Sequence, residues 1–381
     1  MSRPEIDLTV VGGGIVGCAV ADAAARAGRS VVLLEQEPAL AHGTTSRNSE
    51  VAHGGMYYPA GSLKARFCVE GRRLLRAFSA EAGLPWRECG KLIVAVEPDE
   101  VPALEALHAL GLANGVEDLQ LLAGADLRRL EPGVLATAAL LSPRTAVCDA
   151  EGLARAFARR AAAHGAQVMT GARVAGLEPA AGGWRVTVAG DGRREGWTHT
   201  SRTVVNAAGL WADRVAALAG IDVDRRGWRQ VLVRGNYFSI DPRHRGRVGR
   251  LVYPLPPADG STLGAHLCLD VGDGLRLGPD FEPPLAAGTD PATITWAVDP
   301  ARAAAFHAGA ARFLPWLERS DLAPAMSGMR PKLAAEGFRD FVADRGEGDL
   351  AGLVNLVGID SPGLTASPAL ARHVVEDLLA D

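Results

Sequence analysis

The chain has 381 residues, of which 48% are hydrophobic and 22% are charged. This composition excludes a disordered chain and a small disulfide-rich scaffold, and the length predicts two or three domains. The formal net charge of −4, without a basic tract, argues against nucleic acid as a partner.

Residues 1–35 have the pattern of one βαβ unit. A β-branched run at Ile6–Val11 predicts a strand, and an alanine-rich segment that ends near Gly28 predicts a helix. Ser30–Glu35 is a second apolar run and predicts a buried strand. Residues 12–17, between the first strand and the helix, read G-G-G-I-V-G and have the GxGxxG spacing of dinucleotide-binding loops.

The glycine-rich loop provides separate features for a dinucleotide. Gly12 makes the tight turn, Gly14 lets a pyrophosphate approach the backbone, and Gly17 lets the helix pack closely on the sheet. The backbone N–H groups from Ile15 onward lie at the helix N-terminus, where the helix dipole favours phosphate. The alternative is a glycine-rich turn with a structural role alone.

Glu35 and Gln36 stand at the end of the second predicted strand, about 20 residues after the loop. An acid at this place accepts hydrogen bonds from ribose hydroxyls in dinucleotide-binding folds. Because the strand, the helix and the acid all accompany the loop, we expect a dinucleotide site here.

The sequence also bears on the compartment. The apolar stretch at residues 8–21 is short and interrupted by glycines, so we expect neither a signal peptide nor a transmembrane segment. The 5 cysteines are scattered without CxxC spacing, which predicts free thiols rather than a disulfide frame or a zinc site. We therefore expect a cytoplasmic protein and leave peripheral contact with a membrane open.

Later segments predict further elements. Strands are expected within 168–197 and at 203–209, 231–239, 262–269 and 353–358, and helices at 301–317 and 361–379. The strands at 231–239 and 262–269 are expected in a separate sheet, with Pro254, Pro256 and Pro257 in the connection between them.

Four blocks of the sequence together carry a family resemblance. They are residues 44–70, with S-R-N-S-E-V-A-H-G-G-M-Y-Y followed by G-S-L-K-A-R; 203–211, T-V-V-N-A-A-G-L-W; 327–333, S-G-M-R-P-K-L; and 353–365, ending in G-I-D-S-P-G-L-T. The pattern resembles the FAD-dependent D-amino-acid-oxidase-type superfamily and, within it, the L-2-hydroxyglutarate dehydrogenase/oxidase family, essentially from end to end. One departure is Glu50, where that family mostly has a small residue, and it leaves the exact substrate open.

The resemblance implies an α/β (α+β) two-domain flavoprotein, in which a Rossmann-like FAD-binding domain is combined with a substrate domain built on an antiparallel sheet. We expect the FAD-binding domain to be discontinuous over residues 1–85, 145–225 and 325–381. The substrate domain is expected over residues 86–144 and 226–324.

FAD, held without a covalent bond, is the cofactor that the resemblance implies. A covalent tether through His53 is the alternative. The C-terminal loop and helix would place a helix N-terminus near the flavin, where its positive end stabilises the negative charge of the reduced ring. Beyond the first βαβ unit, the residues expected to bind FAD are Thr45, Ser46, Arg47, Asn48, Ser49, Val174, Ala208, Gly209, Trp211, Gly358, Ser361, Pro362, Gly363, Leu364 and Thr365.

The activity that the resemblance implies is oxidation of a small 2-hydroxy acid, L-2-hydroxyglutarate to 2-oxoglutarate, by hydride transfer to flavin N5. A base must take the hydroxyl proton, and an imidazole titrates near working pH. His53 is the first candidate for this base and His266, on an expected strand, is the second. The alternatives are that His53 only contacts the flavin and that His266 is an ordinary strand histidine.

A hydroxy acid also needs cations and phenols that hold its carboxylates. Arg330 and Lys332 are the candidates for the first carboxylate, since a guanidinium grips a carboxylate bidentately. Lysine is rare in this chain, at positions 64, 91 and 332 alone. Tyr253 and Tyr58 could donate phenol hydrogen bonds. Lys64 could bind a distal carboxylate or simply lie on a solvated helix face.

Two rival functions stay open at this point. The first is an amine-oxidising member of the same superfamily, of the glycine or sarcosine oxidase type. The second is a flavin-binding protein without catalysis. The electron acceptor of the expected enzyme, whether quinone, another carrier or oxygen, cannot be read from the sequence.

Overall fold

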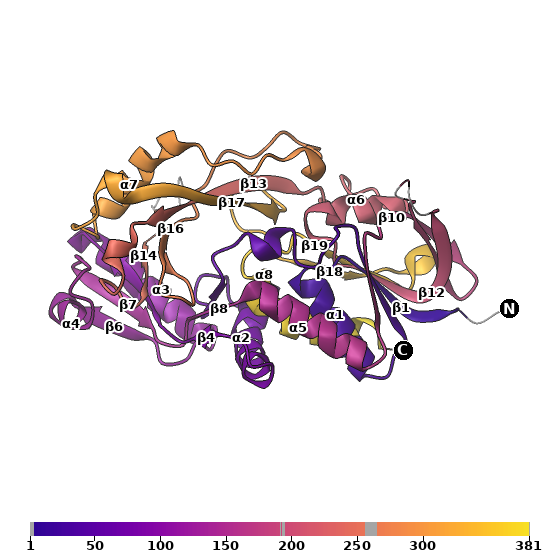
Figure 1. Cartoon of the computed structure of the whole chain (residues 1–381). Helices are drawn as coiled ribbons and strands as arrows, with labels where there is room; N and C mark the ends of the chain where they lie inside the picture. Colours follow the sequence, from indigo (N-terminus) through magenta and orange to yellow (C-terminus); the bar gives the residue numbers. More distant parts are fainter. Residues whose placement is uncertain (1–3, 191, 193–194, 256–264, 381) are drawn as a thin grey trace.

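The computed structural model describes residues 4–190, 192, 195–255 and 265–380 (Figure 1). Two eight-stranded sheets and a small three-stranded sheet form the framework. The main helices are α1 (Ile15–Arg26), α2 (Leu63–Glu81), α3 (Val101–Ala113), α4 (Gly124–Leu130), α5 (Ala150–Ala163), α6 (Ala212–Leu218), α7 (Ala303–Ala311) and α8 (Gly363–His373).

The first large sheet contains the N-terminal βαβ unit. Its central strand is β1, which pairs in parallel with β2 on one side and with β12 on the other. Helices α1, α5 and α8 share one hydrophobic core with this sheet, and α6 packs on the core of the opposite face. The strands are β1 (Ile6–Val11), β2 (Val31–Glu35), β9 (Gln167–Thr170), β10 (Val174–Ala180), β11 (Gly183–Val188), β12 (Trp197–Asn206), β18 (Val342–Arg345) and β19 (Leu353–Val357).

The second large sheet lies at the other end of the molecule (Figure 1). Its order is β17-β13-β16-β15-β14-β5-β7-β6, with β5 (Lys91–Ala95), β6 (Gln120–Ala123), β7 (Ala138–Ser142), β13 (Val231–Ile240), β14 (Leu251–Pro254), β15 (Leu267–Leu269), β16 (Leu275–Leu277) and β17 (Leu322–Lys332). The predicted antiparallel sheet needs one correction, because β14 pairs with β5 in parallel. These two strands are far apart in the sequence, so no hairpin forces them into antiparallel pairing.

The small sheet connects the two halves. It consists of β3 (Val51–Ala52), β8 (Ala146–Cys148) and β4 (Trp86–Arg87), in the order β3-β8-β4. β3 leads directly to His53, so this pairing fixes where the histidine block begins.

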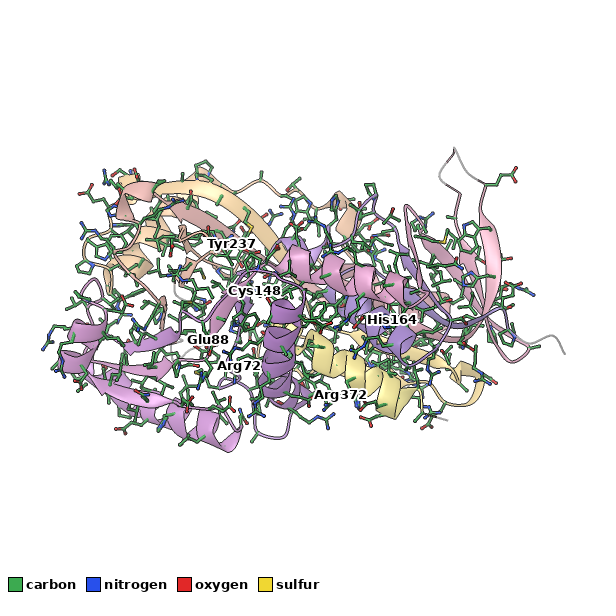
Figure 2. The ribbon with its side chains drawn as sticks, turned by 60° about the horizontal axis from the view of Figure 1, so that its bottom comes forward. Arg72, Glu88, Cys148, His164, Tyr237 and Arg372 are labelled. Carbon is green, nitrogen blue, oxygen red and sulfur yellow. The ribbon has the colours of Figure 1, made fainter. Side chains whose placement is uncertain are left out.

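Helix α2 packs closely against α8, the last α-helix in the described part of the chain. Figure 2 shows the two helices side by side, with Arg72 on α2 and Arg372 on α8. A Cβ on Gly71 would lie 2.2 Å from the carbonyl oxygen of Thr365, so a larger residue would push the helices apart. The contact therefore holds the first turn of α8 in place.

Several predicted elements are confirmed, and two end differently. β1 and β2 match the predicted strands, with Ser30 left outside the second. The helix predicted at 301–317 ends at Ala311, because Pro315 follows and disfavours helical backbone just before it. The last helix continues beyond α8 as a π-helical turn, Val374–Leu378. Of the strand predicted at 262–269, residues 262–264 lie outside the described residues, as do Pro256 and Pro257.

The division into two domains stays a proposal, with one boundary moved. β17 pairs with β13 over its whole length, up to Lys332 opposite Val231. Arg330 and Lys332 therefore belong to the second sheet, although the predicted FAD-binding segment began at residue 325. Among the described residues, no helix has the length and apolarity that a membrane span requires; the cytoplasmic location stays a prediction.

Candidate functional site

One large cavity lies between the two eight-stranded sheets. Its volume is about 850 Å³, within the range of roughly 300–1,000 Å³ that is typical of ligand sites. Most of the predicted site residues line it: Gly12, Gly14, Ile15, Glu35, Gln36, Thr45, Arg47, Asn48, Ser49, His53, Tyr58, Val174, Ala208, Gly209, Trp211, Tyr253, His266, Arg330, Ser361, Pro362, Gly363 and Leu364.

Four of the predicted cofactor residues, Gly17, Ser46, Gly358 and Thr365, do not line the cavity. A Cβ on Gly17 would be 1.9 Å from the carbonyl oxygen of Gly12, so Gly17 permits the close contact between α1 and β1. The hydroxyl of Ser46 donates to the carbonyl of Gly43 at 3.2 Å. The backbone N–H of Gly358 donates to the side chain of Gln230 at 3.2 Å. These residues make internal contacts that support the cavity wall, but they do not line the cavity.

The glycine-rich loop presents backbone to the cavity. Gly12 has a φ of +109°, which favours glycine, and a Cβ there would lie 2.5 Å from the carbonyl oxygen of Ala207. At Gly14, leaving out its chain neighbours, one atom of the described residues lies within 4 Å of such a Cβ, the Thr45 hydroxyl oxygen at 3.2 Å. Helix α1 begins just after Gly14, and the N–H of its first residue, Ile15, donates to the Thr45 hydroxyl at 3.0 Å. A phosphate can therefore approach this helix N-terminus.

Glu35 is held at the end of β2 and lines the cavity. Its carboxylate accepts hydrogen bonds from the N–H of Gly13 at 2.6 Å and of Glu37 at 2.8 Å. Burial is the largest influence on this carboxyl and raises its pKa. Each oxygen keeps acceptor capacity beyond these bonds, so Glu35 can fix the loop and still accept from a ligand hydroxyl.

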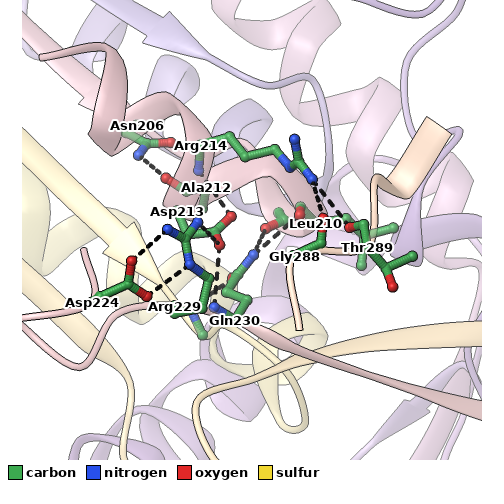
Figure 3. A network of polar contacts seen from close by, with 12 residues as sticks. Asn206, Leu210, Ala212, Asp213, Arg214, Asp224, Arg229, Gln230, Gly288 and Thr289 are labelled. Carbon is green, nitrogen blue, oxygen red and sulfur yellow. Dashed lines mark hydrogen bonds and ion pairs between the residues drawn. The ribbon is translucent and has the colours of Figure 1, made fainter. Parts of the chain in front are cut away.

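A buried glutamine joins two segments of the wall. The side chain of Gln230 donates to the carbonyls of Gly209 and Leu210, both at 3.1 Å, and Figure 3 shows it beside Leu210. Its oxygen accepts from the N–H of Gly358. The loop after β12 and the loop after β19 are therefore held together where they border the cavity. Asp213 supports the arrangement by accepting from the backbone of Gln230 at 3.3 Å.

His53 follows β3 and faces the cavity. Its backbone N–H donates to the hydroxyl of Thr365 at 2.9 Å; Thr365, predicted to bind the cofactor, thus positions His53 from behind the wall. Within the described part of the chain, the ring nitrogen Nδ1 is buried without a partner. Burial, together with the nearby Lys91 and His266, lowers the pKa of His53 well below 6.5, so the imidazole is neutral at pH 7.

His266, just before β15, also lines the cavity and stacks on Tyr253. The two ring centroids are 3.7 Å apart and the planes differ by 1°. Burial, with Lys91 and Arg330 nearby, lowers the pKa of His266 to about 3. A ring that is stacked this closely on a neighbour suits packing or hydrogen bonding better than the transfer of a proton.

All 4 tyrosines of the chain line the cavity, including Tyr57, which adjoins Tyr58 beside the His53 block, and Tyr237, which sequence reasoning did not place in the site. The hydroxyls of Tyr237 and Ser49 are 2.9 Å apart. Tyr237, which is labelled in Figure 2, lies on β13 of the second large sheet. The signal that could have found it is strand periodicity, because Gly235 and Tyr237 are two residues apart on β13 and both face the cavity.

Arg330 lines the cavity from β17 and is half-buried. Its guanidinium donates to the carbonyl of Asp280 at 2.9 Å and to that of Arg234 at 3.4 Å. These bonds use two of the five N–H donors. Gly235 lies against the guanidinium, because a Cβ there would be 2.7 Å from Nη2. Burial lowers the pKa of Arg330, yet a guanidinium stays charged at pH 7.

Neither of the two other predicted cations lines the cavity. Lys64 is buried and forms an ion pair with Asp360, with 2.6 Å between Nζ and Oδ1, so its ammonium is not available to a distal carboxylate. Lys332 is half-buried, and its Nζ lies 5.5 Å from the ring centroid of Phe281. Asp360, which sequence reasoning missed, lines the cavity beside Ser361.

Replacing Lys64 with Met should lower the free energy of unfolding by about 3–5 kcal/mol, because Asp360 would be left as a buried charge without its partner. Burial raises the pKa of Asp360 and Lys64 opposes that shift. Denaturant unfolding at neutral pH measures the loss. The double variant K64M/D360N should recover most of it, and an unchanged stability of K64M would contradict a stabilising pair.

Glu50, the departure from the family pattern, does not line the cavity. Its carboxylate pairs with Arg276 at 3.3 Å, and its backbone has a φ of +57°. The unusual residue therefore changes the support behind Ser49 rather than the surface that a substrate meets.

The residues on this wall fit an FAD. The N-terminus of α1 and the glycine backbone at Gly14 border the cavity and suit a diphosphate, and Glu35 suits a ribose. The first turn of α8 borders the opposite part of the cavity with Gly363 and Leu364. Its positive end suits an electron-rich ring system.

Comparison with known proteins agrees with this fit. The mitochondrial L-2-hydroxyglutarate dehydrogenase of Arabidopsis thaliana is 34% identical, over 100% of this chain and 84% of the plant protein. The dithionite-reduced L-alpha-glycerophosphate oxidase of Mycoplasma pneumoniae with FAD bound has a TM-score of 0.86 and 26% identity, with 99% of this chain and 95% of that chain covered. A glycine oxidase from Geobacillus kaustophilus has a TM-score of 0.81 and 21% identity, with 99% and 95% covered.

A family model described as FAD dependent oxidoreductase, DAO, matches residues 7–377. The predicted fold class and the predicted cofactor are confirmed by this match and by the solved structures. Because the match spans nearly the whole chain, the protein belongs to the DAO family of FAD-dependent oxidoreductases.

Proposed function

We propose that this enzyme oxidises L-2-hydroxyglutarate to 2-oxoglutarate. The observation that carries the proposal is the end-to-end similarity to the plant L-2-hydroxyglutarate dehydrogenase. The chemistry of the cavity supports it, because a half-buried guanidinium, two neutral imidazoles and four phenols gather on walls that an organic acid would contact.

Bound FAD supplies the acceptor for the hydride that leaves the carbinol carbon. Arg330 holds the carboxylate next to that carbon with its remaining N–H donors, in the planar geometry that suits a carboxylate. His53 accepts the hydroxyl proton at Nε2, since its Nδ1 is buried. Tyr58 and Tyr253 donate phenol hydrogen bonds from the same walls.

The test is anaerobic reduction of the FAD-loaded enzyme by a panel of single substrates. L-2-Hydroxyglutarate should bleach the visible flavin band, and its D-enantiomer, glycine, sarcosine and glycerol 3-phosphate should not. Bleaching by glycine or sarcosine alone would replace the proposal with an amine oxidase. A protein that binds FAD and is reduced by none of these compounds would also contradict it.

Replacing Glu35 with Ala should weaken FAD binding by roughly 10–100-fold, the effect of losing hydrogen bonds to a charged group. The carboxylate also holds the N–H of Gly13, so the loop loses support as well. Titration of the apoprotein with FAD, followed by flavin fluorescence, measures the change. Glu178→Ala, on the exposed surface of β10, is the matched control. An unaltered FAD affinity of E35A would contradict the assigned role.

A further inference from the structure

Lys91 is a buried cation beside the cavity that the proposed mechanism does not use. It is the first residue of β5 and has no exposed surface. Among the described residues its Nζ has no hydrogen-bond partner. The ammonium lies 4.5 Å from the ring centroid of Tyr57 and 4.9 Å from that of Tyr253. Aromatic faces replace only part of the hydration shell that such a charge has lost.

The titratable groups around Lys91 are neutral at pH 7. Burial raises the pKa of the Cys68 thiol to about 12 and also raises that of Cys268. The phenols of Tyr57 and Tyr253 have raised pKa values for the same reason. The two nearby imidazoles, of His53 and His266, have lowered values. No acidic side chain in the described ranges pairs with this ammonium, so the chain offers it no counter-ion there.

Lys91 lies next to the cavity, because two of the aromatic rings that contact its ammonium also line the cavity. Tyr57, Tyr253 and His266 line the cavity, whereas Lys91 does not. The ammonium of Lys91 therefore lies behind the rings of Tyr57 and Tyr253, which form the cavity wall. His266 is within electrostatic reach of both Lys91 and Arg330, so two cations flank this part of the cavity.

We propose that Lys91 is a specificity-determining positioning residue, whose charge favours a dicarboxylate by attracting the carboxylate that Arg330 does not hold. The inference rests on the proposed function, because it deepens the choice of substrate for the same site. Because the rings of Tyr57 and Tyr253 stand between Lys91 and the cavity, the ammonium would attract a bound carboxylate electrostatically and would not donate a hydrogen bond to it. A neutral amine or a monocarboxylate would leave the buried ammonium without a counter-charge.

The test compares ligands of different charge in the FAD-loaded enzyme. Glutarate, butyrate and butyramide lack the hydroxyl group and are not oxidised, so their binding can be titrated through the flavin spectrum and by calorimetry. Lys91→Met should lower the affinity for glutarate by about tenfold or more, lower that for butyrate less, and leave butyramide unchanged. Arg159→Met, which removes an exposed charge on α5, should bind all three as the wild type does. An equal loss for all three ligands in K91M would overturn the proposal.

The pH dependence provides a second readout. Burial lowers the pKa of Lys91 to about 8, and the six neighbouring groups named above do not titrate near that value. Glutarate affinity of the wild type should therefore fall as pH rises from about 7 to 9, because the ammonium loses its proton. K91M should lack this part of the fall, while any contribution from Lys332, whose pKa is also lowered, should persist. If glutarate affinity fell equally steeply with pH in the wild type and in K91M, Lys91 would not be the group that attracts the carboxylate.

Stability separates a charge role from a structural one. Replacement of an unpaired buried charge by an apolar side chain of similar length should leave the ligand-free holoenzyme as stable as the wild type or more so. Should K91M fail to fold, the wild-type pH profile decides, since a glutarate affinity that is constant over this range overturns the proposal. Failure of L-2-hydroxyglutarate to reduce the flavin would reject the proposed function, whereas the glutarate series tests Lys91 independently.

Discussion

Replacing His53 with Ala is expected to slow flavin reduction by L-2-hydroxyglutarate by roughly 10²–10⁴-fold, the range that removal of a general base typically costs. The variant should bind FAD and the non-oxidised analogue glutarate nearly as well as the wild type, because the backbone N–H of His53, rather than its ring, bonds to Thr365. Single-turnover absorbance measurements under anaerobic conditions isolate the chemical step from reoxidation.

His266 is the matched control for this experiment. It is a second neutral imidazole in the same cavity, with a pKa lowered by burial as that of His53 is, but its ring stacks on Tyr253. His266→Asn should therefore affect substrate binding more than the reduction rate. A wild-type rate in H53A together with a large loss in H266N would move the base to His266.

The low pKa values also predict a pH profile. A histidine of ordinary pKa would lose its activity as a base below about pH 6.5. His53 has its pKa lowered well below 6.5, so it stays neutral and able to accept a proton at lower pH. The limiting rate of flavin reduction should therefore be flat between about pH 6 and 8. A midpoint near 6.5 in this profile would contradict the burial of His53.

The fold could be predicted where its constraints are local. β1, the glycine-rich loop and α1 follow from side-chain size and periodicity within a short window. The parallel pairing of β14 with β5 could not be predicted, because the two strands come from distant segments. The assignment of β17 to the second sheet has the same origin, since its partner β13 is also distant in the sequence.

The site could be predicted where motifs carry the chemistry, and less well where packing decides a role. Motifs led to Glu35 and Arg330, which line the cavity as expected. Lys64 was a reasonable candidate from its place in a family block, but Asp360 occupies its ammonium, and that contact joins residues far apart in the chain. Lys91 had a compositional signal in the rarity of lysine, yet its burial against Tyr57 is visible only in the folded protein.

Replacing Arg330 with Ala is expected to lower kcat/KM for L-2-hydroxyglutarate by about 100-fold or more, mainly through KM. Hydrogen bonds to charged groups contribute about 1.5–3 kcal/mol each, and every 1.4 kcal/mol is a tenfold change. A guanidinium that makes two such bonds to a carboxylate accounts for an effect of this size. Steady-state kinetics with saturating electron acceptor and direct glutarate titration both measure it.

Two comparisons make the assignment of Arg330 specific. Arg330→Lys keeps the charge but loses the planar fork, so it should recover only part of the affinity. Added guanidine should partly restore binding in R330A, because truncation opens space beside Gly235, which now lies against Nη2. These expectations depend on contact between Arg330 and a carboxylate. If R330A instead lost the same fraction of its affinity for glutarate and for butyramide, the effect would come from the lost hydrogen bonds to the carbonyls of Asp280 and Arg234. The carboxylate contact would then have to be assigned to another cation.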